Sequence, residues 1–185
     1  MIDLSNIEGV CFVGIGGIGM SAIARWFIAG GYDVSGYDRS ESNITKSLST
    51  EGCHVTFEDD IFSLPAIYSD MDVRDKVLVI YTPAIPAENK ILSWFRDNSY
   101  LLYKRAEILG EISENTETLA VAGTHGKTTV STMLAHILKQ SSLDCSAFLG
   151  GISKNYDSNL LLGDSHRIDR GRCPPMQSGG CFEKP

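Results

Sequence analysis

Apolar runs and amphipathic segments alternate along most of this chain. The apolar run at residues 9–14, GVCFVG, precedes a segment at 17–29 whose apolar residues recur at helical spacing, and the run YDVSGYD then ends at Asp38. A strand, a helix and a second strand in this order predict a βαβ unit with parallel strands. The opening pattern therefore indicates an α/β fold.

The alternation continues to residue 113. The pattern predicts helices at 44–51, 90–98 and 106–113, and strands at HVTF (54–57), KVLVIY (76–81) and YLLY (100–103). The acidic stretch 58–75 carries neither periodicity and is predicted to be irregular. Strands that alternate with helices predict a parallel sheet, and we assign this first α/β domain to residues 1–113.

A second unit follows the polar run SENTET at 113–118, which we interpret as a domain boundary. The pattern beyond it predicts a strand at 119–123, a helix at 127–141 and a strand at 145–151, again in an α/β arrangement with parallel strands. We assign this second domain to residues 118–165. Two strands and one helix leave apolar sheet surface without cover, so we expect this domain to lean on the first for its stability.

The last stretch of the chain breaks the alternation. Residues 166–185, HRIDRGRCPPMQSGGCFEKP, hold three of the six prolines and contain no Leu or Val. Neither a strand nor a helix period is present in this stretch. We therefore expect an irregular tail.

Between the first predicted strand and its helix lies a loop with Gly14, Gly16 and Gly19 in the spacing GxGxxG. In this context the glycines allow a tight turn, a close approach of a diphosphate to the backbone, and close packing of the helix. The helix N-terminus adds unpaired amides and a partial positive charge. Asp38 ends the next strand, where such folds place an acid beside a ribose. A glycine turn with only a structural role is the alternative.

A second glycine loop, GTHGKTT at residues 123–129, lies between a predicted strand and a predicted helix. In phosphate-binding loops the amides hold the phosphates, the lysine reaches the terminal ones, and the hydroxyl after it binds Mg²⁺. Here Lys127 and Thr128 would take those two roles. The full pattern GxxxxGK[ST] is not met, because Val121 stands where it needs a glycine. His125 is either a phosphate contact or a residue of a solvent-facing turn.

Composition narrows the classes of partner. The content of 43% hydrophobic and 21% charged residues is ordinary for a globular protein. The net charge of -7 argues against nucleic acid and anionic membranes as partners. The five cysteines show no CxxC spacing, the N-terminus lacks a basic leader, and no apolar run reaches the length of a membrane span. We therefore expect a cytoplasmic protein with reduced thiols.

With these loops the sequence resembles the Mur ligases of peptidoglycan synthesis, and among them the members that join L-alanine to UDP-N-acetylmuramate. The resemblance covers about residues 8 to 165. It is carried by the stretches FVGIGGIGMSAIA (12–24), YTPAIP (81–86), KRAEILGEI (104–112), AVAGTHGKTTVSTMLAHIL (120–138) and AFLGGISKNYDSNLLLG (147–163). A GTHGKTT loop that follows a GxGGxGM loop in one chain makes the resemblance specific.

The resemblance implies a Rossmann-like first domain that holds UDP-N-acetylmuramate and the start of a P-loop ATPase-like second domain that holds ATP. ATP would convert the sugar's acid to an acyl phosphate, and the amine of L-alanine would then displace phosphate. Lys127 would be the catalytic residue, and Thr128 would bind Mg²⁺. The implied ATP-binding residues are Gly123, Thr124, His125, Gly126, Lys127, Thr128 and Thr129, and the implied UDP-sugar residues are Gly14, Gly16, Gly17, Ile18, Gly19, Asp38, Thr82, Pro83, Ala84 and Ile85.

The chain departs from the family pattern after residue 165. The resemblance implies an acidic EADE-like motif that helps to bind Mg²⁺, the rest of the ATPase domain and a third domain for the amino acid, where this chain has residues 166–185. Our hypothesis is a truncated, inactive product whose tail arises from a frame shift or a junction. Three alternatives are a nicotinamide-dependent oxidoreductase, a non-catalytic UDP-sugar-binding module, and a related ligase that attaches a preformed peptide to the same sugar.

Overall fold

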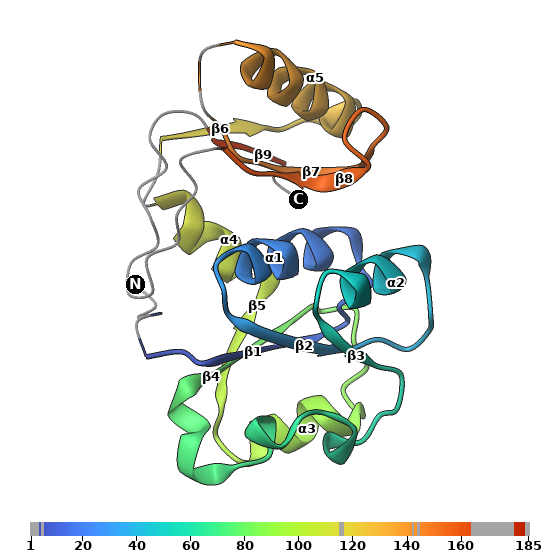
Figure 1. Ribbon diagram of the computed structural model, residues 1–185, viewed down its shortest axis with the longest axis vertical. Coiled ribbons are helices and arrows are strands. Elements are labelled where there is room, and N and C mark those ends of the chain that lie inside the picture. Colours follow the sequence, from blue (N-terminus) through green and yellow to red (C-terminus); the bar gives the residue numbers. More distant parts are fainter. Residues whose placement is uncertain are drawn as a thin grey trace.

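Five parallel strands form the first sheet in the order β3-β2-β1-β4-β5 (Figure 1). The computed structural model describes residues 4, 6–114, 117–141, 143, 145–163 and 180–183. Val13 at the end of β1 is paired with Tyr37 of β2 and with Tyr81 of β4, so these three strands end at the same edge. The strands are β1 (Gly9–Val13), β2 (Asp33–Tyr37), β3 (His54–Thr56), β4 (Val77–Tyr81) and β5 (Leu101–Lys104). The strand order reverses between β1 and β4, where open α/β sheets bind ligands.

Helices cover both faces of this sheet (Figure 1). One face packs against α1 (Ile18–Ala29), α2 (Asn43–Thr50) and α4 (Arg105–Glu114), and the other against α3 (Lys90–Asp97). The stretch predicted to be irregular forms three 3-10 turns on the α3 side, at Ile61–Ser63, Ala66–Tyr68 and Met71–Lys76. Polar caps begin α2 and α3: the Ser42 side chain accepts a 3.2 Å hydrogen bond from the Thr45 amide, and the Asn89 side chain accepts a 2.8 Å one from the Leu92 amide.

The buried positions of β1 explain its uninterrupted apolar sequence. Val10 and Phe12 pack in the cluster on the α1 side, whereas Cys11 and Val13 pack in the cluster on the α3 side. All four side chains are fully buried. A strand covered on both faces needs no polar alternation, so the predicted Rossmann-like parallel sheet is confirmed.

The second sheet has the order β6-β9-β7-β8 and lies beyond α1 (Figure 1). Its strands are β6 (Thr118–Val121), β7 (Ala147–Ser153), β8 (Ser158–Leu161) and β9 (Gly180–Glu183), and α5 (Lys127–Gln140) covers the face away from α1. The prediction for this unit is wrong in omitting β8, which pairs antiparallel with β7. The connection between them is a short turn in which Asp157 has φ 48, and a connection that short can only form a hairpin.

The expectation of an irregular tail is also wrong at one place. Residues 180–183 form β9, which pairs in parallel with β6 and with β7 and so fills the position between them. Backbone pairing along a sheet does not require an apolar period of its own, so the pattern of apolar residues does not predict this strand. Residues 164–179 and 184–185, on which the rest of the predicted tail falls, lie outside the described part of the chain.

The helix α1 lies between the two sheets and contacts both β7 and β8 (Figure 1). Phe148 of β7 and Leu160 of β8 belong to the same buried cluster as Phe12 and Trp26 of the first unit. The second unit therefore shares apolar core with the first, as its small size predicts. The division of the chain into two domains, residues 1–113 and 118–165, remains a proposal.

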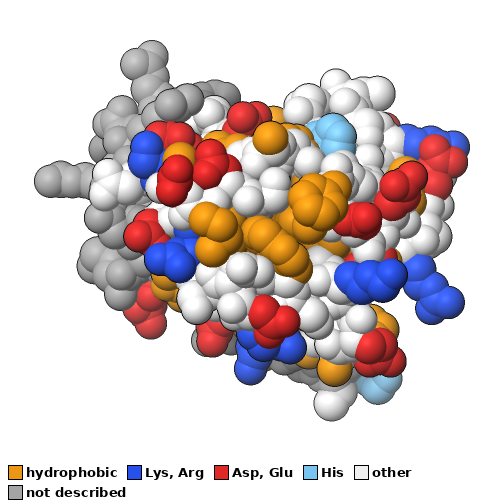
Figure 2. All heavy atoms as spheres, turned by 90° about the horizontal axis from the view of Figure 1, so that it is seen from below, with side chains coloured by type: hydrophobic (Ala, Val, Ile, Leu, Met, Phe, Trp, Pro, Cys, Tyr) orange, Lys and Arg blue, Asp and Glu red, His pale blue; other side chains and the backbone are white. Residues whose placement is uncertain are grey.

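Solvent reaches more of the second unit than of the first. Leu119 of β6 is 44% exposed, whereas the apolar residues of β1 are fully buried. On α5, Val130, Met133 and Ile137 are each more than half exposed. On the α3 side of the first unit, acidic and basic side chains are interspersed around hydrophobic ones, with no continuous basic patch in view (Figure 2). None of the described helices has the length and apolar character needed to cross a membrane.

Candidate functional site

The first glycine loop leaves the end of β1 and is held against two neighbouring segments. The amides of Gly14 and Ile15 donate to the Tyr37 carbonyl of β2 at 2.8 and 3.0 Å. Gly14 has φ 92, and a Cβ on it would lie 2.9 Å from Thr82 Cγ2 and 3.1 Å from Ile85 Cδ1. The loops after β1 and β4 therefore pack together at the point where the strand order reverses, and only glycine fits at Gly14.

Asp38 holds the middle of this loop. Its Oδ2 accepts a 2.7 Å hydrogen bond from the Gly16 amide, and its Oδ1 accepts one from Ser40. Burial, with smaller contributions from the Asp59 and Asp38 carboxylates, raises the pKa of the neighbouring Tyr37 hydroxyl. The hydroxyl therefore stays neutral at physiological pH.

The beginning of α1 opens toward the second unit. Its N-cap is Gly17, and the amides in a first helical turn have no partner within the helix. A Cβ on Gly19 would lie 2.6 Å from Arg105 Nη1, so the Arg105 guanidinium lies against the backbone of this turn. The sequence predicts that Gly19 allows close packing of the helix. In the structure, the absence of a side chain at Gly19 makes room for the Arg105 guanidinium.

The second glycine loop connects β6 to α5. Gly126 is the N-cap of α5 with φ 79, a conformation that glycine adopts without strain. Lys127 Nζ donates to the Gly123 carbonyl at 2.8 Å, so the lysine side chain folds back over its own loop. Thr124 and His125 are exposed. This geometry is that of a loop with exposed backbone and one lysine beside it.

A cleft of about 420 Å³ joins the two loops. The first unit contributes the start of α1, the loop after β4 and the start of α4, and the second unit contributes Lys127 and part of β7. The lining residues are Gly17, Ile18, Gly19, Met20, Ala22, Ile23, Thr82, Ala84, Arg105, Leu109, Lys127, Phe148, Leu149 and Gly150. Two cations and a helix N-terminus around one cleft favour an anionic ligand.

Comparison with known proteins identifies the family of the chain. A sequence profile described as the Mur ligase family, catalytic domain, matches residues 9–117. The chain belongs to the Mur ligase family. Curated relatives named UDP-N-acetylmuramate--L-alanine ligase are 50% identical over 88% of this Mur ligase chain in Cytophaga hutchinsonii and 59% identical over 85% of it in Porphyromonas gingivalis. The chain spans about a third of the length of each, 34% in both cases.

Solved Mur ligase structures share the fold. A UDP-N-acetylmuramate-alanine ligase from Thermotoga maritima superposes with a TM-score of 0.76 at 29% identity, over 95% of this chain and 36% of that one. A UDP-N-acetylmuramate:L-alanyl-gamma-D-glutamyl-meso-diaminopimelate ligase from Neisseria meningitides gives a TM-score of 0.78 at 23% identity, over 96% of this chain and 52% of that one. The second likeness concerns the fold alone.

The cleft of this Mur ligase collects part of the predicted site. Among predicted residues it is lined by Gly17, Ile18, Gly19, Thr82, Ala84 and Lys127. The other predicted residues lie outside its lining, in the two glycine loops or beside them: Gly14, Gly16, Asp38, Pro83, Ile85, Gly123, Thr124, His125, Gly126, Thr128 and Thr129. The Gly16 amide, predicted to face the diphosphate, is bonded to Asp38 instead. The roles of all the predicted residues as ligand contacts remain proposals.

Sequence reasoning missed two parts of the cleft. Arg105 begins α4 directly after β5, and among the described residues no hydrogen bond or ion pair ties its guanidinium to another group. The position of a cation at the carboxyl edge of a parallel strand was a signal that could have identified it. Phe148, Leu149 and Gly150 gave no such signal, because they reach the cleft only through the packing of β7 against α1.

The described residues offer little to a magnesium ion by themselves. Within that part of the chain, no three His, Cys, Asp or Glu side chains gather in a group that could hold a metal. Thr128 supplies one hydroxyl at the start of α5. Mg²⁺ commonly takes few protein ligands and completes its shell with phosphate oxygens and water. Thr128 fits such a site only with a nucleotide in place.

Proposed function

We propose that this chain carries the sugar-nucleotide site and the ATP loop of a ligase that joins L-alanine to UDP-N-acetylmuramate. The observation that supports it is the cleft, in which the start of α1 and Lys127, from two different units, line one space. Two phosphate-binding devices that share a cleft suit a reaction between two phosphorylated substrates. The family relationship supports the same assignment.

In the proposed reaction a carboxylate oxygen of UDP-N-acetylmuramate attacks the γ-phosphorus of ATP, and the bond to ADP breaks. The amine of L-alanine then attacks the acyl carbon, phosphate leaves with the electrons of the carbon–oxygen bond, and the amine loses a proton. The barrier to the first step is largely charge repulsion, which cations at the transferring group reduce. Magnesium held by Thr128 and the phosphates would neutralise charge in the same place.

The residues of this chain divide between the two substrates. The first-turn amides of α1 and the Arg105 guanidinium would hold the UDP diphosphate, because both present positive charge to the same side of the cleft. Lys127 would leave the Gly123 carbonyl and reach the terminal phosphates of ATP. Phe148 and Leu149 would exclude water from the space between the substrates.

A cytoplasmic location is part of the proposal. ATP is the phosphoryl donor, and Cys11, Cys53 and Cys145 are buried free thiols, which is typical of a reducing compartment.

Calorimetric titration of the chain tests the proposal. We expect UDP-N-acetylmuramate to bind with a stoichiometry of one per chain, ATP to bind weakly, and NADH to give no heat of binding. Binding of NADH in place of the UDP-sugar would favour a nicotinamide-dependent oxidoreductase and contradict the proposal. In a longer form of the protein with the same residues 1–163, phosphate release from ATP should require L-alanine. Release that instead requires a preformed peptide would identify the peptide-attaching ligase.

A further inference from the structure

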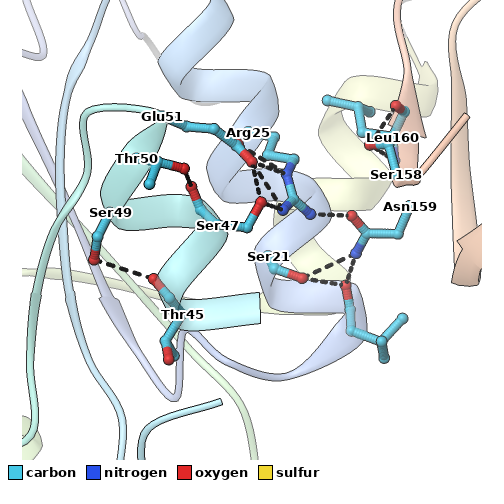
Figure 3. Close-up of polar contacts among 11 residues, drawn as sticks. Ser21, Arg25, Thr45, Ser47, Ser49, Thr50, Glu51, Ser158, Asn159 and Leu160 are labelled. Carbon is cyan, nitrogen blue, oxygen red and sulfur yellow. Dashed lines mark hydrogen bonds and ion pairs between the residues drawn. The ribbon is translucent and has the colours of Figure 1, made fainter. Parts of the chain in front are cut away.

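Asn159 of β8 is a fully buried amide that reaches from the second unit into the first turn of α1 (Figure 3). Its Nδ2 donates to the Ile18 carbonyl at 2.6 Å and to Ser21 Oγ at 2.9 Å. Its Oδ1 accepts from Nη1 of Arg25. A single side chain thus bonds to three residues in the first two turns of one helix.

The partners of Asn159 are themselves held in place. Arg25 Nε lies 2.8 Å from Glu51 Oε2 at the end of α2, and Arg25 Nη2 donates to Ser47 Oγ at 3.0 Å (Figure 3). The Arg25 side chain is 10% exposed, which removes most of the solvent that would compete for these bonds. Ser21 Oγ donates to the same Ile18 carbonyl at 2.9 Å. The network therefore fixes α1, α2 and β8 in one arrangement.

This network adjoins the cleft. Ile18 is the first residue of α1 and lines the cleft, and its carbonyl is the atom that Asn159 holds. The hairpin that carries Asn159 also supplies Phe148, Leu149 and Gly150 to the lining. One element thus both bounds the cleft and fastens the helical turn whose amides face it. A first turn is where a helix frays most easily, because its amides lack partners within the helix.

We propose that Asn159 is a positioning residue for the sugar-nucleotide site. It holds the first turn of α1 in the geometry that binds the diphosphate, and it does so from the unit that carries the ATP loop. The inference rests on the proposed function for the identity of the ligand. Its consequence is that affinity for UDP-N-acetylmuramate depends on a hairpin outside the sugar-nucleotide unit.

Asn159→Asp tests this without changing the size of the side chain. The variant keeps an acceptor for Arg25, loses both donors and places a carboxylate beside the Ile18 carbonyl. We expect the Kd for UDP-N-acetylmuramate to rise about tenfold, the scale of losing the hydrogen bond to the Ile18 carbonyl and setting a carboxylate against it, while the Kd for ATP changes less than about twofold. A merely structural role would weaken the ATP site first, because Asn159 belongs to that unit. Ser21→Ala is the substitute if Asn159→Asp does not fold. We expect it to weaken binding of UDP-N-acetylmuramate by a smaller factor and to leave the Kd for ATP unchanged.

The matched control is Asn155→Asp, which makes the same chemical change at an exposed position of the turn between β7 and β8. We expect neither affinity to change in it. Hydrogen exchange gives a readout that needs no ligand: the Ser21 amide, bonded to the Gly17 carbonyl at 2.8 Å, should exchange faster in Asn159→Asp and at the wild-type rate in the control.

The two readouts separate this inference from the proposed function. A wild-type chain that does not bind UDP-N-acetylmuramate contradicts the proposed function. Faster exchange of the Ser21 amide in Asn159→Asp would still support the inference that Asn159 stabilises the first turn of α1. Unchanged exchange at Ser21 overturns the inference whether or not the ligand binds. A variant that binds UDP-N-acetylmuramate as tightly as the wild type also overturns it.

Discussion

The Asp38 carboxylate accepts a 2.7 Å hydrogen bond from the Gly16 amide, which ties the end of β2 to the glycine loop after β1. A carboxylate bonded to a backbone amide is a strong contact, because the acceptor is charged. The acid thus shapes the loop itself. A ribose contact from the same residue would use its other oxygen, which accepts from the Ser40 amide at 3.3 Å.

Replacing Gly16 with Val should weaken UDP-N-acetylmuramate binding by about tenfold or more, the scale set by loss of one charged hydrogen bond. A Cβ at Gly16 would lie 2.8 Å from Asp38 Oδ2 and 3.1 Å from Thr45 Cγ2, so the carboxylate must leave the amide. Calorimetry should show ATP affinity unchanged. Gly110→Ala is the control, because a Cβ there meets nothing within 4 Å and alanine favours helix. Equal UDP-sugar affinity in both variants would remove Gly16 from the site.

Lys127→Ala should abolish the affinity for ATP that the chain has and leave UDP-N-acetylmuramate binding within about twofold, because the two ligands rest mainly on different units. In a form of the protein that carries out ligation, the rate should fall on the order of 10³-fold, the scale of a cation lost from a phosphoryl-transfer site. Lys154→Ala, at an exposed position of the β7–β8 turn, should leave both unaffected. Near wild-type turnover in Lys127→Ala would refute its catalytic role.

Phe148→Ala should lower the free energy of unfolding of the whole chain by about 3–5 kcal/mol, the usual cost of deleting a buried phenyl group. Phe148 is 5% exposed and shares a cluster with Phe12 and Trp26, so the cavity would open between the two units. Urea unfolding followed by circular dichroism measures the change. Ile152→Ala on the same strand, where the side chain is 41% exposed, should cost far less. Equal losses in the two variants would mean that the units do not share a core.

The stability of the chain should fall as pH rises above about 9. Burial, with a smaller contribution from Glu51, raises the pKa of the Cys53 thiol from 9.0 to about 12, and burial likewise raises the pKa of Cys11. Between these values the unfolded chain releases a proton that the native chain keeps, so rising pH favours unfolding by up to about 1.4 kcal/mol per pH unit for each thiol. Below pH 8 the contribution of both thiols is fully present.

Urea unfolding at pH 8, 9 and 10 measures this slope. Cys53→Ala should make the slope shallower, whatever its effect on stability at pH 8. A slope identical to that of the wild type would show that the Cys53 thiol ionises as easily in the native chain as in the unfolded one.

The first unit could be predicted from the sequence because each of its elements carries a local signal. Apolar runs such as 77–81 have the length of strands, and polar caps such as Ser42 and Asn89 mark where helices begin. The strand β8 was not predicted although Asp157 lies in a polar stretch typical of turns, because the alternation of strands and helices in the rest of the chain favours parallel pairing and not a hairpin.

The candidate site was harder to predict, since it depends on contacts between distant parts of the chain. The glycine loops and Lys127 have sequence patterns, and they were identified. Phe148 has none, and Arg105 has only its place directly after a parallel strand; both reach the cleft because β7 and α4 pack against α1. The hydrogen bond between Asp38 and the Gly16 amide could not be predicted either. It depends on how far the Asp38 side chain extends from the end of β2 toward the loop after β1, and the sequence does not specify that distance.

The two cations of the cleft, Arg105 from one unit and Lys127 from the other, belong to a chain whose net charge is -7. An anionic ligand is therefore repelled at long range and attracted only once it is near the cleft. Salt screens interactions beyond about 8 Å at physiological ionic strength far more than those at contact. Moderate salt should consequently speed the encounter with a sugar nucleotide even as it shortens the lifetime of the complex, the reverse of a protein whose overall charge draws its ligand in.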